Sequence, residues 1–157
     1  MSEALAGVLV VDMGGSVATT YCAKLFADYG ATVINLETPQ GFPTRQLRPF
    51  TKGASCDSAM HGYLNADKKS VRLDLLSDSA VAKILSRADL VLSDGRADLS
   101  EEIRLRMDIS WYGESGPYAD FIGTDAQCFA LNGMLRTIGH LEGPPLIPTG
   151  YQAQIVG

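Results

Sequence analysis

The first 37 residues contain the pattern that most constrains the fold: a strand, a turn, a helix and a second strand. Residues 7–12 are apolar and β-branched, which is typical of a strand buried on both faces of a parallel sheet. Gly14-Gly15-Ser16 interrupts that run, and apolar residues then recur at helical spacing from Val17 to a helix end at Gly30. Residues 31–36 are again β-rich. The pattern predicts a βαβ unit with a right-handed crossover.

The same alternation continues along the chain. Pro and Gly residues without a sustained period predict a long irregular connection over residues 38–60. Further strands are expected at residues 70–75, 89–92 and 106–110, and further helices at residues 77–87, 125–137 and 151–157. We therefore expect an α/β fold with a Rossmann-like, open, mostly parallel sheet and helices on both faces.

Composition narrows the class of protein. A chain of 157 residues with 46% hydrophobic residues can bury one core without disulfides or metals. Thirteen Lys and Arg against eighteen Asp and Glu give a net charge of −5, which argues against a nucleic-acid partner. The apolar runs are far shorter than the roughly 20 residues of a membrane helix. We expect no partner in the membrane.

The N-terminus and the cysteines point to a cytoplasmic protein. Residues 1–7 carry an acidic residue and no basic region, unlike a secretory signal. Cys22, Cys56 and Cys128 are odd in number and form no C-x-x-C pair, which favours free thiols in a reducing compartment. His61 and His140 stand in turn-like surroundings and are interpreted as surface residues. We therefore expect no metal.

The Gly14-Gly15-Ser16 turn is the first candidate site, because free N–H groups at a helix N-terminus attract phosphate. It lacks the G-x-G-x-x-G pattern, although Glu37 stands where a ribose-binding carboxylate would. A fragment of a dinucleotide-binding oxidoreductase is thus one alternative, and a tight turn of small residues is the simpler interpretation. The pairs Lys68/Lys69 and Arg45/Arg48 could hold an anion or simply be solvated.

Hydrolase chemistry has no support in the sequence. There is no G-x-S-x-G nucleophile turn, no P-loop and no H-E-x-x-H motif. Glu114 and Asp120 flank a Gly-Pro turn, where a carboxylate pair is more often a cap than an acid–base couple.

Several segments together resemble the class III coenzyme A (CoA) transferase family, also called CaiB/BaiF. LFADYGATVINLE is similar to the family's LADLGADVIKVE, and NADKKSVRLDL to its N-x-x-K-[RK]-S-V-x-L-D-L. The matching segments, in order, are residues 5–12, 25–37, 65–75, 88–92, 112–120 and 139–145. The resemblance implies the N-terminal CoA-binding portion, residues 1–157, of a longer chain that forms interlocked dimers. We therefore expect a homodimer or association with the missing C-terminal part.

The resemblance also implies where chemistry occurs. The family's Asp, which attacks the acyl-CoA carbonyl, falls at Gln154, and an amide cannot replace it. CoA phosphates are expected near Ala18 and Arg45, with Lys68 or Lys69 nearby. The complete set of expected CoA-binding residues is Ala18, Arg45, Lys68, Lys69, Leu73, Asp74 and Asp125. We expect a CoA-transferase-like protein that is catalytically impaired or, alternatively, a non-catalytic half of a two-copy or heteromeric transferase.

Overall fold

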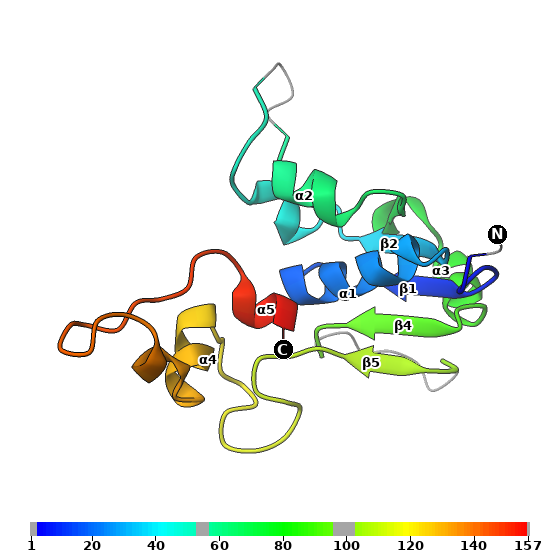
Figure 1. Ribbon diagram of the computed structural model, residues 1–157. Coiled ribbons are helices and arrows are strands. Elements are labelled where there is room, and N and C mark those ends of the chain that lie inside the picture. Colours follow the sequence, from blue (N-terminus) through cyan, green and yellow to red (C-terminus); the bar gives the residue numbers. More distant parts are fainter. Residues whose placement is uncertain (1–2, 53–56, 96–102, 157) are drawn as a thin grey trace. The chain divides into compact units, whose positions relative to one another are not determined.

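The computed structural model describes residues 3–52, 57–95 and 103–156. The chain forms two compact units, Met1–Ile109 and Ser110–Gly157. The first unit contains the sheet, and the second contains short helices joined by loops (Figure 1).

The first unit is built on five parallel strands. They are β1 (Leu9–Asp12), β2 (Thr32–Glu37), β3 (Lys69–Arg72), β4 (Leu90–Ser93) and β5 (Arg106–Asp108), in the order β3-β2-β1-β4-β5. Every pairing among them is parallel, with Val10 opposite Val33 on one side of β1 and opposite Leu90 on the other. The predicted α/β fold with a parallel sheet is confirmed.

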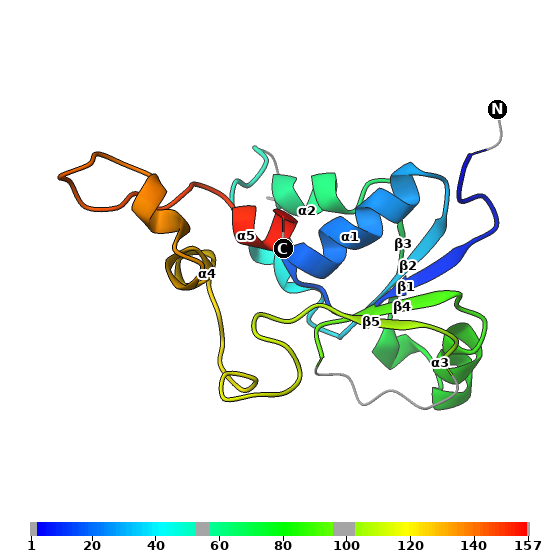
Figure 2. The same ribbon diagram turned by 60° about the horizontal axis from the view of Figure 1, so that its bottom comes forward.

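Helices cover both faces of this sheet (Figure 2). Helix α1 (Val17–Asp28) packs Ala23 against Val10 and Val33, while α3 (Asp78–Leu85) packs Leu85 against Val11 on the opposite face. Neighbouring residues of one strand thus serve different cores, because strand side chains alternate between faces. Helix α2 (Ala59–Leu64) lies beside α1.

The connection over residues 38–60 is less irregular than predicted. It contains the 3₁₀ helix η1 (Pro43–Gln46), and α2 begins at Ala59 after Ser58, whose side chain accepts a hydrogen bond from the His61 N–H. Six residues are too few to show a helical period, so α2 was not predicted from the sequence. His61 is accordingly on a helix and half-buried, rather than in a surface turn as interpreted.

Two other predicted elements are shorter than expected. Strand β3 stops at Arg72, and the 3₁₀ helix η2 (Leu73–Leu75) replaces the rest of the predicted strand. In the second unit, α4 (Asp125–Leu131) gives way to the 3₁₀ helix η3 (Met134–Thr137). The break occurs because Gly133 adopts φ +78°, a left-handed conformation that ends a helix. The unit closes with α5 (Gln152–Val156).

Candidate functional site

Polar side chains gather at the carboxyl ends of the parallel strands, where open α/β sheets bind ligands. Asp12 ends β1, Glu37 ends β2 and Ser93 ends β4, and all three are buried. Buried polar groups need partners, so the contacts of these residues decide what the edge can bind.

The turn between β1 and α1 is tight, as the simpler interpretation of its sequence predicts. A Cβ on Gly14 would lie 2.5 Å from Thr19, and Gly15, at φ +67°, would place one 2.7 Å from the ring of Phe42. Ser16 caps α1 by accepting a hydrogen bond from the Thr19 N–H at 3.1 Å. Ala18 lies in the first turn of α1 and is partly exposed.

Asp12 supports this turn through a hydrogen bond to its backbone. Its Oδ1 accepts a hydrogen bond from the Gly14 N–H at 3.0 Å. Burial raises the pKa of Asp12 from 3.8 to about 6, although the charge of Lys68 and the backbone hydrogen bonds oppose the rise. Within the described part of the chain, Asp12 Oδ2 and the Oδ1 of its strand neighbour Asn35 have no hydrogen-bond partner.

Glu37 is the centre of the neighbouring strand end. Its carboxylate accepts hydrogen bonds from Arg45 Nε at 2.7 Å and Nη2 at 2.6 Å, from the Phe42 N–H at 2.8 Å, and from the Ser70 hydroxyl. Burial alone would raise the pKa of Glu37, but the hydrogen bonds from Arg45, Ser70 and Phe42 outweigh it and lower the pKa from 4.5 to about 2. Glu37 therefore stays ionised and fixes the loop that carries Arg45.

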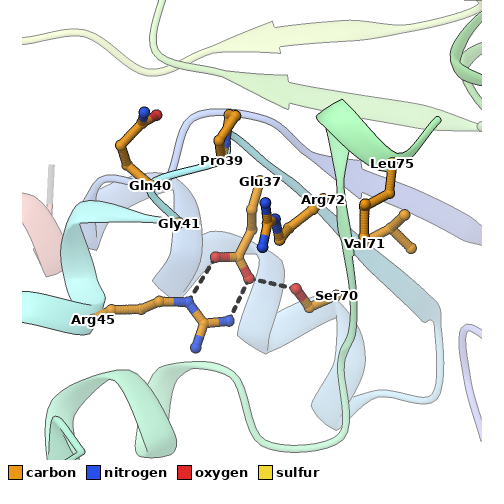
Figure 3. Close-up of a pocket in the computed structure, with 9 residues that line it drawn as sticks. All are labelled: Glu37, Pro39, Gln40, Gly41, Arg45, Ser70, Val71, Arg72 and Leu75. Carbon is orange, nitrogen blue, oxygen red and sulfur yellow. Dashed lines mark hydrogen bonds and ion pairs between the residues drawn. The ribbon is translucent and has the colours of Figure 1, made fainter. Parts of the chain in front are cut away.

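A pocket of about 460 Å³ opens beside this ion pair, and Figure 3 shows the Glu37–Arg45 and Glu37–Ser70 contacts among the residues that line it. It lies between the loop that follows β2 and the strand β3. Its lining combines two guanidinium groups with apolar side chains: Glu37, Pro39, Gln40, Gly41, Arg45, Ser70, Val71, Arg72 and Leu75. This combination suits an anionic ligand with an apolar part.

The predicted basic residues of the first unit differ in their exposure and their partners. Arg45 lines the pocket with its side chain 46% exposed. Lys68 is half-buried and donates to the Thr20 carbonyl at 2.7 Å, so its ammonium group is held inside the unit, whereas Lys69 is exposed. Burial lowers the pKa of Lys68 from 10.5 to about 8, with Asp12 opposing.

The remaining predicted residues lie at the end of β3 and in the second unit. Leu73 packs against the core on the α3 face, and Asp74 pairs with Arg72 at 2.6 Å on the surface. In the second unit, Asp125 Oδ1 accepts a hydrogen bond from the Ala153 N–H at 2.8 Å, and Oδ2 accepts one from Gln154 Nε2 at 3.1 Å. The structure thus places Asp125 directly against Gln154.

The residues that support the pocket loop, residues 39–46, were not predicted from the sequence. Thr44 Oγ1 lies 2.8 Å from His61 Nδ1, and Asn65 Nδ2 lies 3.0 Å from the same nitrogen. No local pattern marks these residues. Only the Ser58 cap signal, which locates α2, could have placed His61 and Asn65 on one helical face.

A metal site and a membrane span are features that the sequence already disfavoured. Within residues 3–52, 57–95 and 103–156, no group of three His, Cys, Asp or Glu side chains is arranged as metal ligands. No helix among the described residues has the length and apolar character needed to cross a bilayer. Cys22 and Cys128 carry free thiols, and Cys56 lies outside the described residues.

Comparison with known proteins agrees with this fold. A model of CoA-transferase family III matches residues 5–157. The probable CoA-transferase Rv1866 of Mycobacterium tuberculosis is 32% identical over 83% of this chain and 18% of the relative. The succinyl-CoA:(R)-benzylsuccinate CoA-transferase subunit BbsE of Thauera aromatica is also 32% identical, over 83% of this chain and 36% of the relative.

A solved structure supports the fold independently. The crystal structure of a CaiB/BaiF family protein from Brucella suis has a TM-score of 0.85 at 23% identity, and the match covers 99% of this chain and 46% of that protein. The chain spans less than half the length of these relatives. Because the family model covers almost every residue, the chain belongs to CoA-transferase family III.

Proposed function

We propose that this chain binds the CoA portion of an acyl-CoA at the carboxyl edge of its sheet, in the pocket beside Glu37 and Arg45. The observation that carries the proposal is the pocket lining, in which Arg45 and Arg72 stand next to apolar side chains within a chain of the CoA-transferase family. CoA has the matching chemistry, since it joins phosphate groups to a planar base.

The residues that line the pocket can be assigned to different parts of the CoA molecule. Arg45 donates Nε and Nη2 to Glu37, and Arg72 donates Nε and Nη2 to Asp74. In this proposal each guanidinium binds phosphate through its remaining N–H groups. Pro39, Val71 and Leu75 offer an apolar surface to the base. Ala18 and Lys69 remain secondary candidates, whereas Lys68 serves the interior.

The contacts of Glu37 favour CoA over the dinucleotide alternative. A ribose-binding carboxylate must be free to accept from the ligand, but Glu37 already accepts from Arg45, Ser70 and Phe42 and its side chain is 1% exposed. In titrations with NADH, we therefore expect no fluorescence enhancement.

Isothermal titration of the 157-residue chain with CoA tests the proposal. We expect binding that weakens in Arg72→Ala and with dephospho-CoA, and that persists in Lys83→Ala, a matched loss of one cation on α3. Absence of both heat and thermal shift at millimolar CoA would refute the proposal.

We further propose that this chain does not transfer acyl groups by itself. Gln154 occupies the position at which the resemblance expects the aspartate nucleophile, and its amide donates to Asp125. Gln154→Asp, with Gln154→Asn as the control of equal length, tests whether a carboxylate restores transfer. Gain of acyl-CoA transfer in the first variant alone would identify a decayed enzyme.

A non-catalytic half is the second candidate, and one observation favours it. The same share of this chain, 83%, corresponds to 18% of Rv1866 but 36% of BbsE, so Rv1866 is about twice as long. Rv1866 therefore has room for two chains of the length of BbsE, each with a part that corresponds to this chain. If the Gln154→Asp variant still transfers no acyl group but binds CoA, the result would support the non-catalytic half. If the chain is instead an impaired CoA-transferase, the expected assembly is a homodimer, and light scattering measures it.

A further inference from the structure

The pocket loop, defined here as residues 39–46, is held at two points. On the pocket side, Arg45 pairs with Glu37. On the opposite side, Thr44 is 1% exposed and its hydroxyl contacts His61 Nδ1 at 2.8 Å. The second contact depends on what His61 Nδ1 can accept or donate.

The surroundings of Asn65 determine the direction of its amide group. Asn65 Nδ2 donates to the His61 carbonyl at 3.0 Å, and Asn65 Oδ1 accepts from Asn35 Nδ2 at 2.6 Å and from Lys68 Nζ at 3.4 Å. A carbonyl can only accept and an ammonium group can only donate, so the reversed amide would oppose both. Asn65 therefore presents N–H groups to His61.

The protonation of His61 follows from this direction. Asn65 Nδ2 lies 3.0 Å from His61 Nδ1, and an amide nitrogen can only donate. Nδ1 must then carry a lone pair, with the proton of the neutral ring on Nε2. The Thr44 hydroxyl, which can rotate, donates to the same nitrogen. A proton on Nδ1 would set two donors against each other and break the contact with Asn65, while the Thr44 hydroxyl would have to turn and accept from the ring.

Charged groups from every neighbouring element act on this imidazole. Arg45 of η1 and Lys68, which precedes β3, disfavour its protonation, whereas Glu37 of β2 and Asp57, which precedes α2, favour it. Burial is the largest cause, and the balance lowers the pKa of His61 below 6.5. The neutral ring is thus the form present at neutral pH.

We propose that His61 is a positioning residue whose neutral, Nε2-protonated ring accepts from Thr44 and Asn65 and so sets the pocket loop, and whose protonation reverses the Thr44 hydrogen bond, separates the ring from Asn65 and thereby shifts that loop. This role concerns the pocket to which CoA binding is assigned above, and so it rests on the proposed function. It makes binding in the pocket sensitive to mild acid, although His61 itself does not line the pocket.

Nitrogen-15 spectroscopy of the imidazoles in the 157-residue chain tests the geometry without a ligand. The signals are assigned by their loss in His61→Asn or His140→Gln, the latter being the other histidine of the chain. We expect His61 to be the Nε2–H tautomer and to titrate below 6.5. The backbone amides of Thr44 and Arg45 should shift with the same midpoint, and those shifts should disappear in His61→Asn. An Nδ1–H tautomer, or loop amides that do not follow His61, would overturn the proposal.

CoA titrations at several pH values test the consequence. In the parent we expect affinity to fall about five-fold below the His61 midpoint, the factor that the loss of one hydrogen bond brings. The CoA phosphate monoester also titrates near pH 6, at about the value of other phosphate monoesters, so the parent is compared with variants at each pH. His61→Asn keeps a polar group near the position of Nδ1 and should bind at pH 7 without the additional acid loss, whereas His61→Phe should bind weakly throughout.

The outcomes separate the two proposals. If CoA binds at no pH, the proposed function fails, while the tautomer and the amide shifts still decide the role of His61. If CoA binds and the parent and His61→Asn show the same pH dependence, the positioning role is refuted and the proposed function stands.

Discussion

The buried carboxylate of Glu37 makes the sharpest stability prediction. Glu37→Gln keeps the shape of the side chain but removes its charge and one acceptor oxygen. Oε1 accepts from Arg45 Nη2 and Ser70, and Oε2 accepts from Arg45 Nε and Phe42 N. An amide nitrogen at either position faces a guanidinium donor, so the variant leaves Arg45 with a repulsive contact.

The lowered pKa of Glu37 gives the folding free energy that Glu37→Gln should lose. A pKa of Glu37 lowered from 4.5 to about 2 corresponds to about 3 kcal/mol of folding free energy, at about 1.4 kcal/mol per pH unit. The Arg45 side chain is 46% exposed, and solvent screening reduces the expected loss to about 2 kcal/mol at pH 7. Since the folded pKa is lowered, this contribution is present above pH 4.5 and is lost as the pH falls toward 2.

Urea unfolding followed by far-UV circular dichroism measures this difference. Circular dichroism reports on the sheet, whereas Trp111 lies in the second unit. Parent and Glu37→Gln should differ by about 2 kcal/mol at pH 7 and converge below pH 3. Asp28→Asn removes a surface partner of Lys24 and should cost about 0.5 kcal/mol or less. A loss below about 1 kcal/mol for Glu37→Gln, or an unchanged acid slope, would contradict the assignment of the pKa.

Three further substitutions test the edge of the sheet and the core. Asp12→Asn replaces the buried carboxyl group with a neutral amide, so it should abolish the fall in stability that the parent shows as the pH rises from 3.8 through about 6; a persisting slope in thermal unfolding would exclude Asp12 as its source. Gly15→Ala should cost about 1–3 kcal/mol, because φ is +67° and the new Cβ meets Phe42; neutral urea unfolding would show that the turn can relax. Leu36→Ala should cost about 2–5 kcal/mol in the same assay, since Leu36 is fully buried, and a loss under 1 kcal/mol would contradict its place in the core.

The α/β class and the first βαβ unit were predictable because they depend on local periodicity. Strand β1 and helix α1 begin within two residues of the expected positions, since apolar residues at a period of two or 3.6 report burial directly. The turn of Gly14 and Gly15 was also predictable, because two adjacent glycines between a strand and a helix indicate a tight turn, although the residue that limits Gly15, Phe42, lies elsewhere in the sequence. The family resemblance likewise rested on contiguous segments.

The partners of the polar residues could not be predicted from local sequence patterns. Glu37 stands where a ribose-binding carboxylate would, yet it is paired with Arg45, eight residues away, and accepts a hydrogen bond from Ser70, which is 33 residues away. His61 looked like a surface residue, and the packing of α2 beside η1 placed its ring against Thr44.

Local sequence thus determined which segments form the sheet and its covering helices, because burial imposes a repeat that a single segment displays by itself. The tertiary structure alone decided which charged groups are paired inside the protein and which still face a ligand. Parallel strands are paired only after a long crossover, and the register of that pairing, with Glu37 opposite Arg72 on β3, is set by the packing of whole faces rather than by any contiguous stretch of residues.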